Sequence, residues 1–464
     1  QNIIPQGNVL GGGTSINAQV YMRGRPQDYN EWQEILRVNN DSLGWSWDDV
    51  LPYFKEMENN SGLDNEYHGK TGALKVSDSS YVNELSNDFV KTVHELGIPL
   101  TNDFNGREQK GVGLYQFMNN KGKRSSAAYA FIEPQKNNPN LTLKLRTKVQ
   151  KVIIENNKAI GVEYINTNNE VFKEFANKEV ILASGSFITP KILMLSGIGN
   201  EIELSTFGIK CIVNLPGVGE NLIDHPECPL IARANGKYGY YKQGQGWRMI
   251  KNGLEFLLFG TGPVNSTGVE AGAFINPIDQ DELAYIQAFF VPSIYMNSDT
   301  IGVIKDDYGM SITTVMTKPK SRGKVTLKSN DPKDMPVIEL NLLKHPDDLK
   351  MMIAGQKFFL KALQEGPLGE KVKEVIIPNT KGLDDNKLAD HCRNFVRTNY
   401  HPSGTAKMGA DNDKMAVLDS KMRVRGIDNL RVCDLSAMPN INSGNTAAPA
   451  MMLGLRCGDL ISNS

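Results

Sequence analysis

Histidines are the side chains of this sequence best suited to acid–base chemistry near neutral pH, and the chain has six of them. They are His68, His94, His225, His345, His391 and His401. His401 differs from the others in its surroundings, because Pro402 favours an extended backbone before it and Gly404 predicts a loop. A single loop histidine is more often structural or merely exposed than catalytic, so these residues alone leave its role open.

A second stretch able to do chemistry is GNVLGGGTSIN, residues 7–17. Its three successive glycines leave backbone N–H groups uncovered, and Thr14 and Ser15 add hydroxyls. Such a loop suits close approach to a phosphate or to a flat polar ring system. It lacks the Gly-Lys-Ser/Thr ending of a P-loop, and a surface turn explains the glycines equally well.

Composition excludes several classes of partner and site. The chain has 51 Lys and Arg against 52 Asp and Glu, spread along 464 residues, so no basic field predicts nucleic acid or an anionic membrane surface. The longest apolar candidate, residues 447–453, contains Pro449 and is far shorter than the roughly 18 residues of a transmembrane segment. The five cysteines lack CxxC spacing, which argues against a disulfide framework and a metal site.

The elements that must position these residues follow from local pattern. Alternating apolar residues over 141–164 predict two strands around a turn at Asn156 and Asn157, and the run 179–183 predicts a strand buried on both faces. A helix is expected within residues 185–199, with Thr189 as its cap, Pro190 in its first turn and Gly197 as a left-handed stop.

The same order of elements recurs near the end of the chain. Residues 429–433 predict a strand, and residues 446–460 an apolar helix that begins near Pro449. Strands that lead into helices through Gly-rich turns indicate an α/β sheet with ligands at the carboxyl ends of its strands. The middle is different: residues 325–341 alternate like broken strands and residues 345–364 have helical spacing, which indicates an inserted α+β domain.

The wider sequence resembles the glucose-methanol-choline (GMC) flavoprotein oxidoreductases. Residues 7–17, with Tyr21, Gly24 and Asn30, are similar to the first signature of that family, and GSFITPKILMLSGIG, residues 185–199, to the second. Similar stretches are LPGVGENLIDH at 215–225, SRGKVTLKSNDP at 321–332, YHPSGTAKMG at 400–409 and NLRVCDLSAMPNINSGNTAAP at 429–449. GNTAAP and RGRPQDYNEW look closest to the insect branch, which includes glucose dehydrogenase-like enzymes.

The resemblance implies a fold and a division of the chain. It implies an α/β FAD-binding domain of Rossmann-like type with a parallel sheet, formed by residues 1–45, 140–225 and 401–464, and an inserted α+β substrate-binding domain on an antiparallel sheet, formed by residues 46–139 and 226–400. Full-length members begin with a GxGxxG unit that holds the FAD pyrophosphate, and no GxGxxG occurs here. The sequence is therefore expected to lack the first βαβ unit of that domain.

The family's activity implies roles for two residues. An alcohol or sugar CH–OH group loses a proton from its oxygen and a hydride from its carbon, and the hydride passes to flavin N5. His401, in YHPSGT, matches the catalytic histidine, and Asn445, in SGNTAAP, matches a position that is His or Asn in the family. Asn445 would orient the substrate oxygen through its amide, although it could equally cap the following helix.

The resemblance also assigns residues to the FAD. They are Gly11, Gly12, Thr14 and Asn17 near the flavin and ribityl chain, Val149 at the adenine, Gly185 near the adenosine, Asp434 and Leu435 near the ribityl-phosphate stretch, and the Thr446 backbone at the flavin. Val149 could instead be core, and Asp434 could cap a turn. Glu270 could face substrate, but a solvated or salt-bridged loop acid is at least as good an interpretation.

These features predict an FAD-dependent enzyme with a small-molecule alcohol substrate and an electron acceptor, oxygen or another. The alternatives are a hydroxynitrile lyase-like activity or an inactive fragment on the same fold. Family resemblance also implies secretion. The sequence does not identify the alcohol, the acceptor or the oligomeric state.

Overall fold

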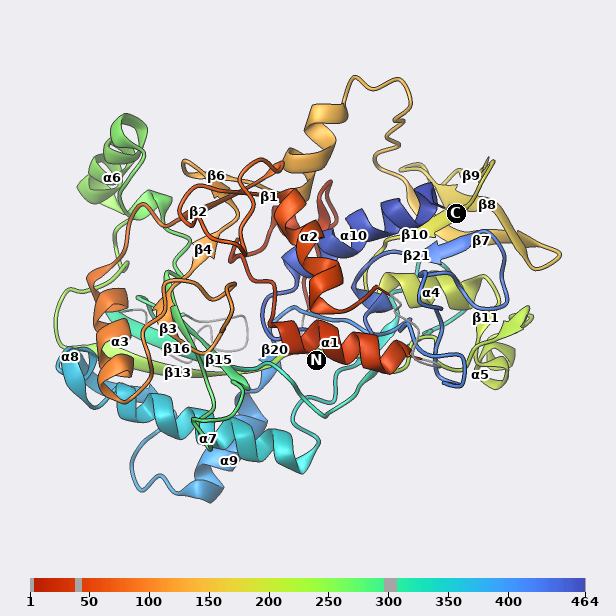
Figure 1. The fold of residues 1–464 in the computed structure, drawn as a ribbon. Helices are drawn as coiled ribbons and strands as arrows, with labels where there is room; N and C mark the ends of the chain where they lie inside the picture. Colours follow the sequence, from red (N-terminus) through yellow and green to blue (C-terminus); the bar gives the residue numbers. More distant parts are fainter. Residues whose placement is uncertain (1–3, 38–43, 296–306, 464) are drawn as a thin grey trace.

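The computed structural model describes residues 4–37, 44–295 and 307–463. Residues 1–3 and 38–43, expected in the FAD-binding domain, and 296–306, expected in the substrate-binding domain, lie outside this description, as does Ser464. The described residues form two large hydrophobic cores, and the elements that build them lie side by side (Figure 1). One is built on an antiparallel sheet, and the other on helices and short parallel strands.

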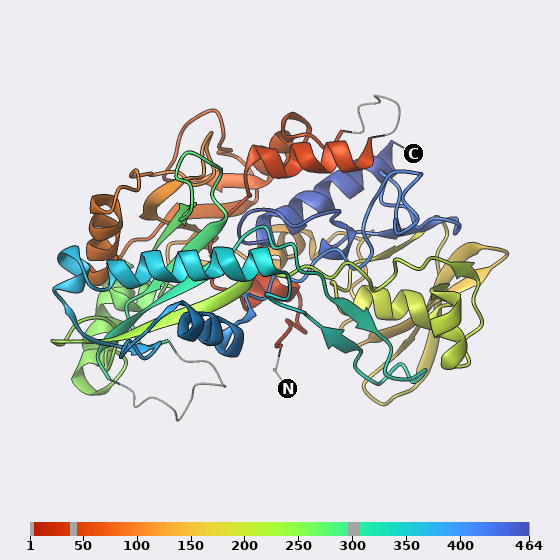
Figure 2. The same ribbon diagram turned by 90° about the horizontal axis from the view of Figure 1, so that it is seen from below.

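The antiparallel sheet has seven strands, and its order is β19-β13-β16-β15-β14-β3, with β20 also paired to β13. The strands are β3 (Gly111–Leu114), β13 (Pro226–Ala234), β14 (Ala271–Ile275), β15 (Ile286–Val291), β16 (Gly309–Met316), β19 (Val372–Ile377) and β20 (Arg397–Thr398). Four helices lie beside this sheet (Figure 2). They are α3 (Glu84–Glu95), α7 (Pro346–Ala362), α8 (Gly366–Gly369) and α9 (Asp385–Phe395). Phe89 of α3 stacks on Phe290 of β15 with ring centroids 4.9 Å apart, which joins helix and sheet in one core.

The other core contains the expected strand-to-helix units. Strand β10 (Val180–Leu182) pairs in parallel with β21 (Leu430–Val432). Strand β10 is followed by α4 (Ile188–Leu195), and β21 by α10 (Ala447–Ser462). A three-stranded antiparallel sheet, β7 (Lys148–Glu155), β8 (Lys158–Ile165) and β9 (Val171–Phe175), adjoins them. The combination of an α/β part and an α+β part on an antiparallel sheet confirms the predicted fold class.

Further helices and strands, with the 3-10 turn of the glycine loop, connect these units. They are a 3-10 turn (Gly12–Ser15), α1 (Pro26–Leu36), α2 (Trp47–Met57), β1 (Glu58–Asn60), β2 (Leu74–Asp78), β4 (Gln116–Phe117), β5 (Asn119–Asn120), β6 (Lys123–Arg124), β11 (Ile198–Gly199), α5 (Glu201–Thr206), β12 (Val213–Asn214), α6 (Gly246–Phe259), β17 (Lys324–Thr326) and β18 (Val337–Glu339). Among the helices that the structure describes, none is long and apolar enough to cross a bilayer.

Several local predictions are confirmed. Strands β7 and β8 meet at Asn156 and Asn157, whose φ angles of 49° and 58° make a tight hairpin turn. Gly197 adopts φ 82° after α4, as a left-handed stop requires. The helix from 447 and the strand at 430–432 also form as expected.

Three local predictions are wrong. Residues 141–147 are not a strand. The neighbouring strand β8 ends at Ile165, which pairs with Lys148 of β7, so the residues before Lys148 have no partner on β8. Strand β10 is buried on one face only, since alternate side chains point to opposite faces and Ile181 lies on the exposed one. Thr189 does not cap α4, because its hydroxyl donates to Asp434 Oδ2 at 2.5 Å and the helix begins at Ile188.

Candidate functional site

Two histidines face each other where the C-terminal loop meets the start of β13. The Nδ1 atoms of His225 and His401 lie 2.9 Å apart, and their ring planes are 87° apart. Both side chains are buried. The backbone around them is fixed, because Ile223 and Ser403 exchange backbone hydrogen bonds and the His401 N–H donates to Asp224 Oδ1 at 3.0 Å.

The Asn442 carbonyl indicates the tautomer of each ring. His225 Nε2 lies 3.0 Å from the Asn442 carbonyl oxygen, an acceptor, so this nitrogen must carry a proton. In a neutral imidazole the other nitrogen is then an acceptor, and His225 Nδ1 accepts from His401 Nδ1–H. His401 Nε2 is left with a bare lone pair, which is the form that a general base needs.

Burial keeps both rings neutral. Desolvation lowers the pKa of His225 to about 3. Desolvation also lowers the pKa of His401 well below its usual value, and the neighbouring His225 lowers it further. Both rings of the pair are therefore unprotonated at neutral pH.

Asn445 reaches the free nitrogen of His401. Its Nδ2 lies 3.3 Å from His401 Nε2, and its Oδ1 accepts from Gln287 Nε2 at 3.2 Å. Gln287 Nε2 also lies 3.2 Å from the Tyr115 hydroxyl, so strand β15 fixes which way the Asn445 amide points. The structure thus brings the two predicted catalytic residues together. Thr446, and not Asn445, occupies the cap position of α10.

Two buried acids flank His225, and both are engaged. Burial raises the pKa of Asp224 to about 7, and this side chain accepts hydrogen bonds from Thr398 Oγ1 and from the His401 backbone. Glu227 forms a buried ion pair with Arg397. Arg397 Nη2 has no hydrogen-bond partner among the described residues.

Some of the residues expected to bind the cofactor are connected by hydrogen bonds to the loop that carries His401. The Gly185 N–H donates to Asp434 Oδ2 at 2.9 Å, and the Gly404 N–H donates to the Leu435 carbonyl at 3.0 Å. Ser186 Oγ donates to the Pro402 carbonyl at 2.7 Å, one residue beyond His401. Asp434 does cap a turn, through the Ser436 N–H at 2.8 Å, while serving Gly185.

The glycine loop has a separate set of partners. Thr14 Oγ1 accepts from the Ala127 N–H at 2.9 Å, and Asn17 Oδ1 accepts from Arg124 Nη1 at 2.7 Å. No hydrogen bond between described residues joins this loop, or Val149 of β7, to the His401 group. Val149 is partly buried against the core, in agreement with the alternative given for it.

The residues present fit an FAD. At Gly12 and Gly185, with φ of 54° and 82°, a Cβ would meet no described atom within 4 Å, so both backbones are open to a ligand. Val9, Leu10 and Ile16, beside the glycine loop, are exposed and offer apolar surface to a flat ring. The N-terminus of α10 has no side-chain cap, which leaves backbone N–H donors next to Asn445.

Glu270 is not a solvated or salt-bridged loop acid. It is fully buried, and its carboxylate accepts hydrogen bonds from the hydroxyls of Ser86, Tyr240 and Ser266 and from the Asn83 N–H. Three separate segments converge on this one side chain, which gives it a structural role between α3, β14 and the loop at Tyr240.

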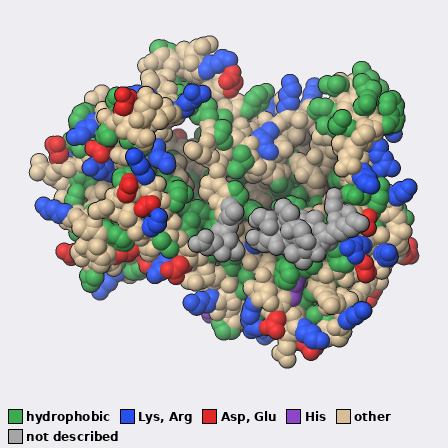
Figure 3. All heavy atoms as spheres, turned by 180° about the vertical axis from the view of Figure 1, so that it is seen from behind, with side chains coloured by type: hydrophobic (Ala, Val, Ile, Leu, Met, Phe, Trp, Pro, Cys, Tyr) green, Lys and Arg blue, Asp and Glu red, His purple; other side chains and the backbone are tan. Residues whose placement is uncertain are grey.

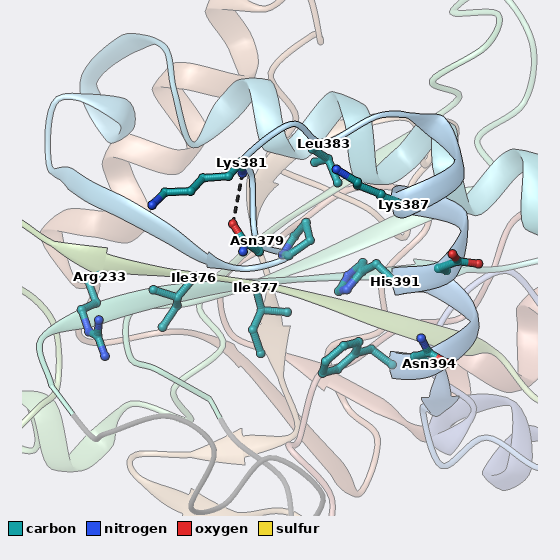
Figure 4. A pocket seen from close by; sticks show the side chains of 12 residues that line it. Arg233, Ile376, Ile377, Asn379, Lys381, Leu383, Lys387, His391 and Asn394 are labelled. Carbon is teal, nitrogen blue, oxygen red and sulfur yellow. Dashed lines mark hydrogen bonds between the residues drawn. The ribbon is translucent and has the colours of Figure 1, made fainter.

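A cavity of about 680 Å³ lies apart from this site, between β19 and α9 (Figure 4). His391 lies at its wall, with Nε2 donating to the Pro229 carbonyl at 3.1 Å. Burial lowers the pKa of His391 to about 4. None of the residues predicted for catalysis or for the cofactor lines this cavity.

Sequence reasoning missed His225, Gln287 and the Asn442 carbonyl. His225 stood within the quoted motif LPGVGENLIDH, and an Asp-His pair before Pro226 was an available signal. Gln287 lies in the strongly apolar stretch IQAFFV, where a single polar residue in a buried strand is itself a signal. The Asn442 contact comes from the backbone, so its residue type carried no information.

Comparison with known proteins adds an independent observation. The two family models described as GMC oxidoreductase match residues 1–227 and 319–454. The chain is 36% identical over 463 residues to an alcohol dehydrogenase [acceptor] of Pseudomonas putida, covering 98% of this chain and 82% of the relative. It is 37% identical over 466 residues to an oxygen-dependent choline dehydrogenase of Rhizobium meliloti, with the same coverage.

Solved structures are similar over nearly the whole chain. Formate oxidase of Aspergillus oryzae, described with its FAD modification, superposes with a TM-score of 0.88 at 26% identity, covering 99% of this chain and 84% of that one. An FAD-dependent oxidoreductase from Chaetomium thermophilum has a TM-score of 0.89 at 23% identity, covering 99% and 87%, which shows a shared fold.

Proposed function

The chain belongs to the GMC oxidoreductase family, an FAD-dependent group of enzymes acting on CH–OH donors, and from this premise we propose that His401 is its general base and Asn445 its orienting residue. One observation carries the proposal. The chain of hydrogen bonds from the Asn442 carbonyl through His225 leaves His401 Nε2 unprotonated and 3.3 Å from the Asn445 amide.

The side chains divide the work between them. When bound, FAD supplies the acceptor for the hydride that leaves the substrate carbon. The substrate hydroxyl enters between His401 Nε2 and Asn445 Nδ2, donates its proton to Nε2 and accepts from the amide. Asn445 gives up its bond to His401 at that moment, and Gln287 keeps its amide in the donating orientation. His225 Nδ1 then faces the proton on His401 Nδ1 of the new imidazolium and stabilises it.

Replacement of His401 tests this assignment. In holoenzyme of the His401→Ala variant, we expect anaerobic flavin reduction by the best alcohol to slow by roughly 100-fold or more, the usual scale for a lost general base. His345→Ala, at an exposed helix N-cap, is the matched control and should reduce at the wild-type rate. Equal rates in wild type and His401→Ala would remove His401 from the base role.

We propose a substrate without a fixed positive charge. A quaternary ammonium such as choline favours a free carboxylate near the reacting carbon, but Glu227 beside His225 is already paired with Arg397, and burial favours the protonated form of Asp224. Choline and its uncharged carbon isostere have the same shape, so the ratio of their kcat/KM values measures the effect of the positive charge alone. The isostere should be the better substrate, and a preference for choline would contradict the proposal.

A sugar hydroxyl remains within this substrate class, as expected from the resemblance to the insect glucose dehydrogenase-like branch. A panel of alcohols and sugars, with oxygen consumption measured beside reduction of an artificial acceptor, assigns both the donor and the acceptor. Release of cyanide from mandelonitrile with the flavin still oxidised would instead indicate a lyase. Secretion stays a prediction, which fractionation of producing cells tests.

A further inference from the structure

Helix α6 (Gly246–Phe259) extends from the body of the protein (Figure 1). Its large apolar side chains are mostly in solvent: Trp247 is 73% exposed, Leu257 78% and Phe259 75%. Met249, Ile250, Leu254, Leu258 and the nearby Val264 are also exposed. A contiguous apolar surface of this kind is unusual on a free protein surface and marks a contact.

Five of the exposed apolar side chains share one face of α6. Trp247, Ile250, Leu254, Leu257 and Leu258 recur at intervals of three, four and one residues, which places them on one side of an α-helix. Asn252 is the buried residue of this fully described helix and lies on the opposite side, where its amide donates to the Gln243 carbonyl at 2.9 Å. The helix is amphipathic with its apolar face turned away from the protein.

Basic side chains lie next to this face and on the side of α6 behind it. Arg248 and Lys251 lie on α6 itself, and Lys242 lies just before it. The β5–β6 hairpin, which carries Lys121 and Lys123, packs on the side of α6 that holds Asn252 and Phe256, because a Cβ at Gly122 would lie 2.6 Å from Phe256 Cε2. Glu255 is the acid of the helix. Figure 3 shows the corner of apolar side chains with Lys and Arg beside it, on a chain whose net charge is -1.

We propose that α6 lies in the surface of an anionic lipid bilayer and anchors the enzyme there peripherally. Its 14 residues are too short to span a bilayer but suit a helix in the interface plane, with apolar residues among the acyl chains and basic residues at the headgroups. A second copy is the poorer occupant, because a two-fold pairing of this face would bring two sets of basic residues together. An anionic surface complements them.

Trp247 is a built-in reporter of this contact. The other tryptophans, Trp32, Trp45 and Trp47, are buried in the first core, so Trp247 is the exposed one. Addition of vesicles of phosphatidylcholine with phosphatidylglycerol to the holoenzyme should shift the tryptophan emission to shorter wavelength. The same vesicles should carry the protein into the pellet on centrifugation.

Two variants separate the apolar and the electrostatic contributions. Leu254→Ser with Leu257→Ser should weaken vesicle partitioning at least about tenfold, because it removes two of the inserted side chains. Lys251→Gln should weaken it about fivefold on phosphatidylglycerol vesicles and leave binding to pure phosphatidylcholine unchanged. Ile202→Ser on α5, 78% exposed but distant from this face in sequence, is the control and should bind as wild type.

The result that overturns the proposal is equally direct. No change in emission and no pelleting of wild type on anionic vesicles would exclude the lipid contact. A wild-type dimer in light scattering that becomes a monomer in the Leu254→Ser, Leu257→Ser variant, without vesicle binding by either, would assign the face to a second copy. Neither readout measures alcohol oxidation, so these experiments test the membrane contact independently of the catalytic assignment.

Discussion

The Nδ1 atoms of His225 and His401 lie 2.9 Å apart although 176 residues separate them in the chain. Two imidazole nitrogens at this distance need one proton between them, and the Asn442 carbonyl decides which ring supplies it. With His401 as the proposed base, we expect His225 to act through it as a positioning residue. Its role is to hold the base in the tautomer that leaves Nε2 free.

Replacement of His225 should expose this role. In His225→Phe the His401 Nδ1–H loses its acceptor, both tautomers become accessible, and we expect anaerobic flavin reduction to slow by about tenfold or more. His225→Gln supplies a carbonyl acceptor at a similar reach and should recover most of the rate. The limiting reduction rate measured against pH checks this: a purely structural role would give equal losses in the two variants and no difference in profile.

Gln287 should control the Asn445 amide. Gln287→Leu removes the donor to Asn445 Oδ1, which frees the amide to turn, and reduction should slow by about tenfold with little change in substrate Kd. Gln287→Glu offers an acceptor in place of a donor, so Asn445 should turn its NH₂ toward the carboxylate and its carbonyl toward His401. That reversal favours a protonated His401, and the rate profile of this variant should move to higher pH. A wild-type rate in Gln287→Leu together with an unshifted profile in Gln287→Glu would contradict the assignment.

Local pattern predicted those parts of the fold that depend on neighbours in sequence. The hairpin at Asn156 and Asn157, the left-handed Gly197 after α4 and the loop at His401 each follow from residues within one turn. The failures depend on distant partners. Thr189 bonds to Asp434 instead of capping its helix, and residues 141–147 lack a strand to pair with because β8 has ended. Glu270 is buried by segments that sequence order keeps apart.

The same reason limits the prediction of the site and its surroundings. His401 and Asn445 come from motifs. Their supports are His225, just before β13, and Gln287 of β15, which meet them only in the folded chain. The distribution of charge in the folded protein also depends on residues that are far apart in the sequence. Lys121 and Lys251 are 130 positions apart by their numbers, so an even distribution along the sequence concealed a basic group that the fold gathers around α6.

A buried ion pair near the N-terminus should dominate local stability. Arg23 Nη2 lies 2.6 Å from Glu58 Oε2 with both side chains fully buried, and Glu58 also accepts from the Gly69 N–H at 2.7 Å. Glu58→Gln leaves the Arg23 charge uncompensated, so the free energy of unfolding in urea should fall by about 3–5 kcal/mol. The exposed pair of Lys144 with Glu174 is the control, and Glu174→Gln should change stability little. Similar losses in both variants would show that burial does not decide the effect.

Asp224 should make the stability of the folded protein depend on pH in an unusual direction. Burial raises its pKa to about 7 from an ordinary value of 3.8, so between these values the folded protein keeps a proton that the unfolded chain releases. Stability from this group is therefore greatest at low pH and falls as pH rises toward 7, by up to about 4 kcal/mol.

Asp224→Asn cannot titrate and removes this dependence. The neutral buried histidines act in the opposite direction, because unfolding lets them take up protons below about pH 6.5, but they are common to both proteins and cancel in the comparison. The free energy of unfolding of Asp224→Asn minus that of wild type should therefore increase from pH 5 to about pH 7 and level off above it. A difference that stays constant over this range would place the pKa of Asp224 back at its ordinary value.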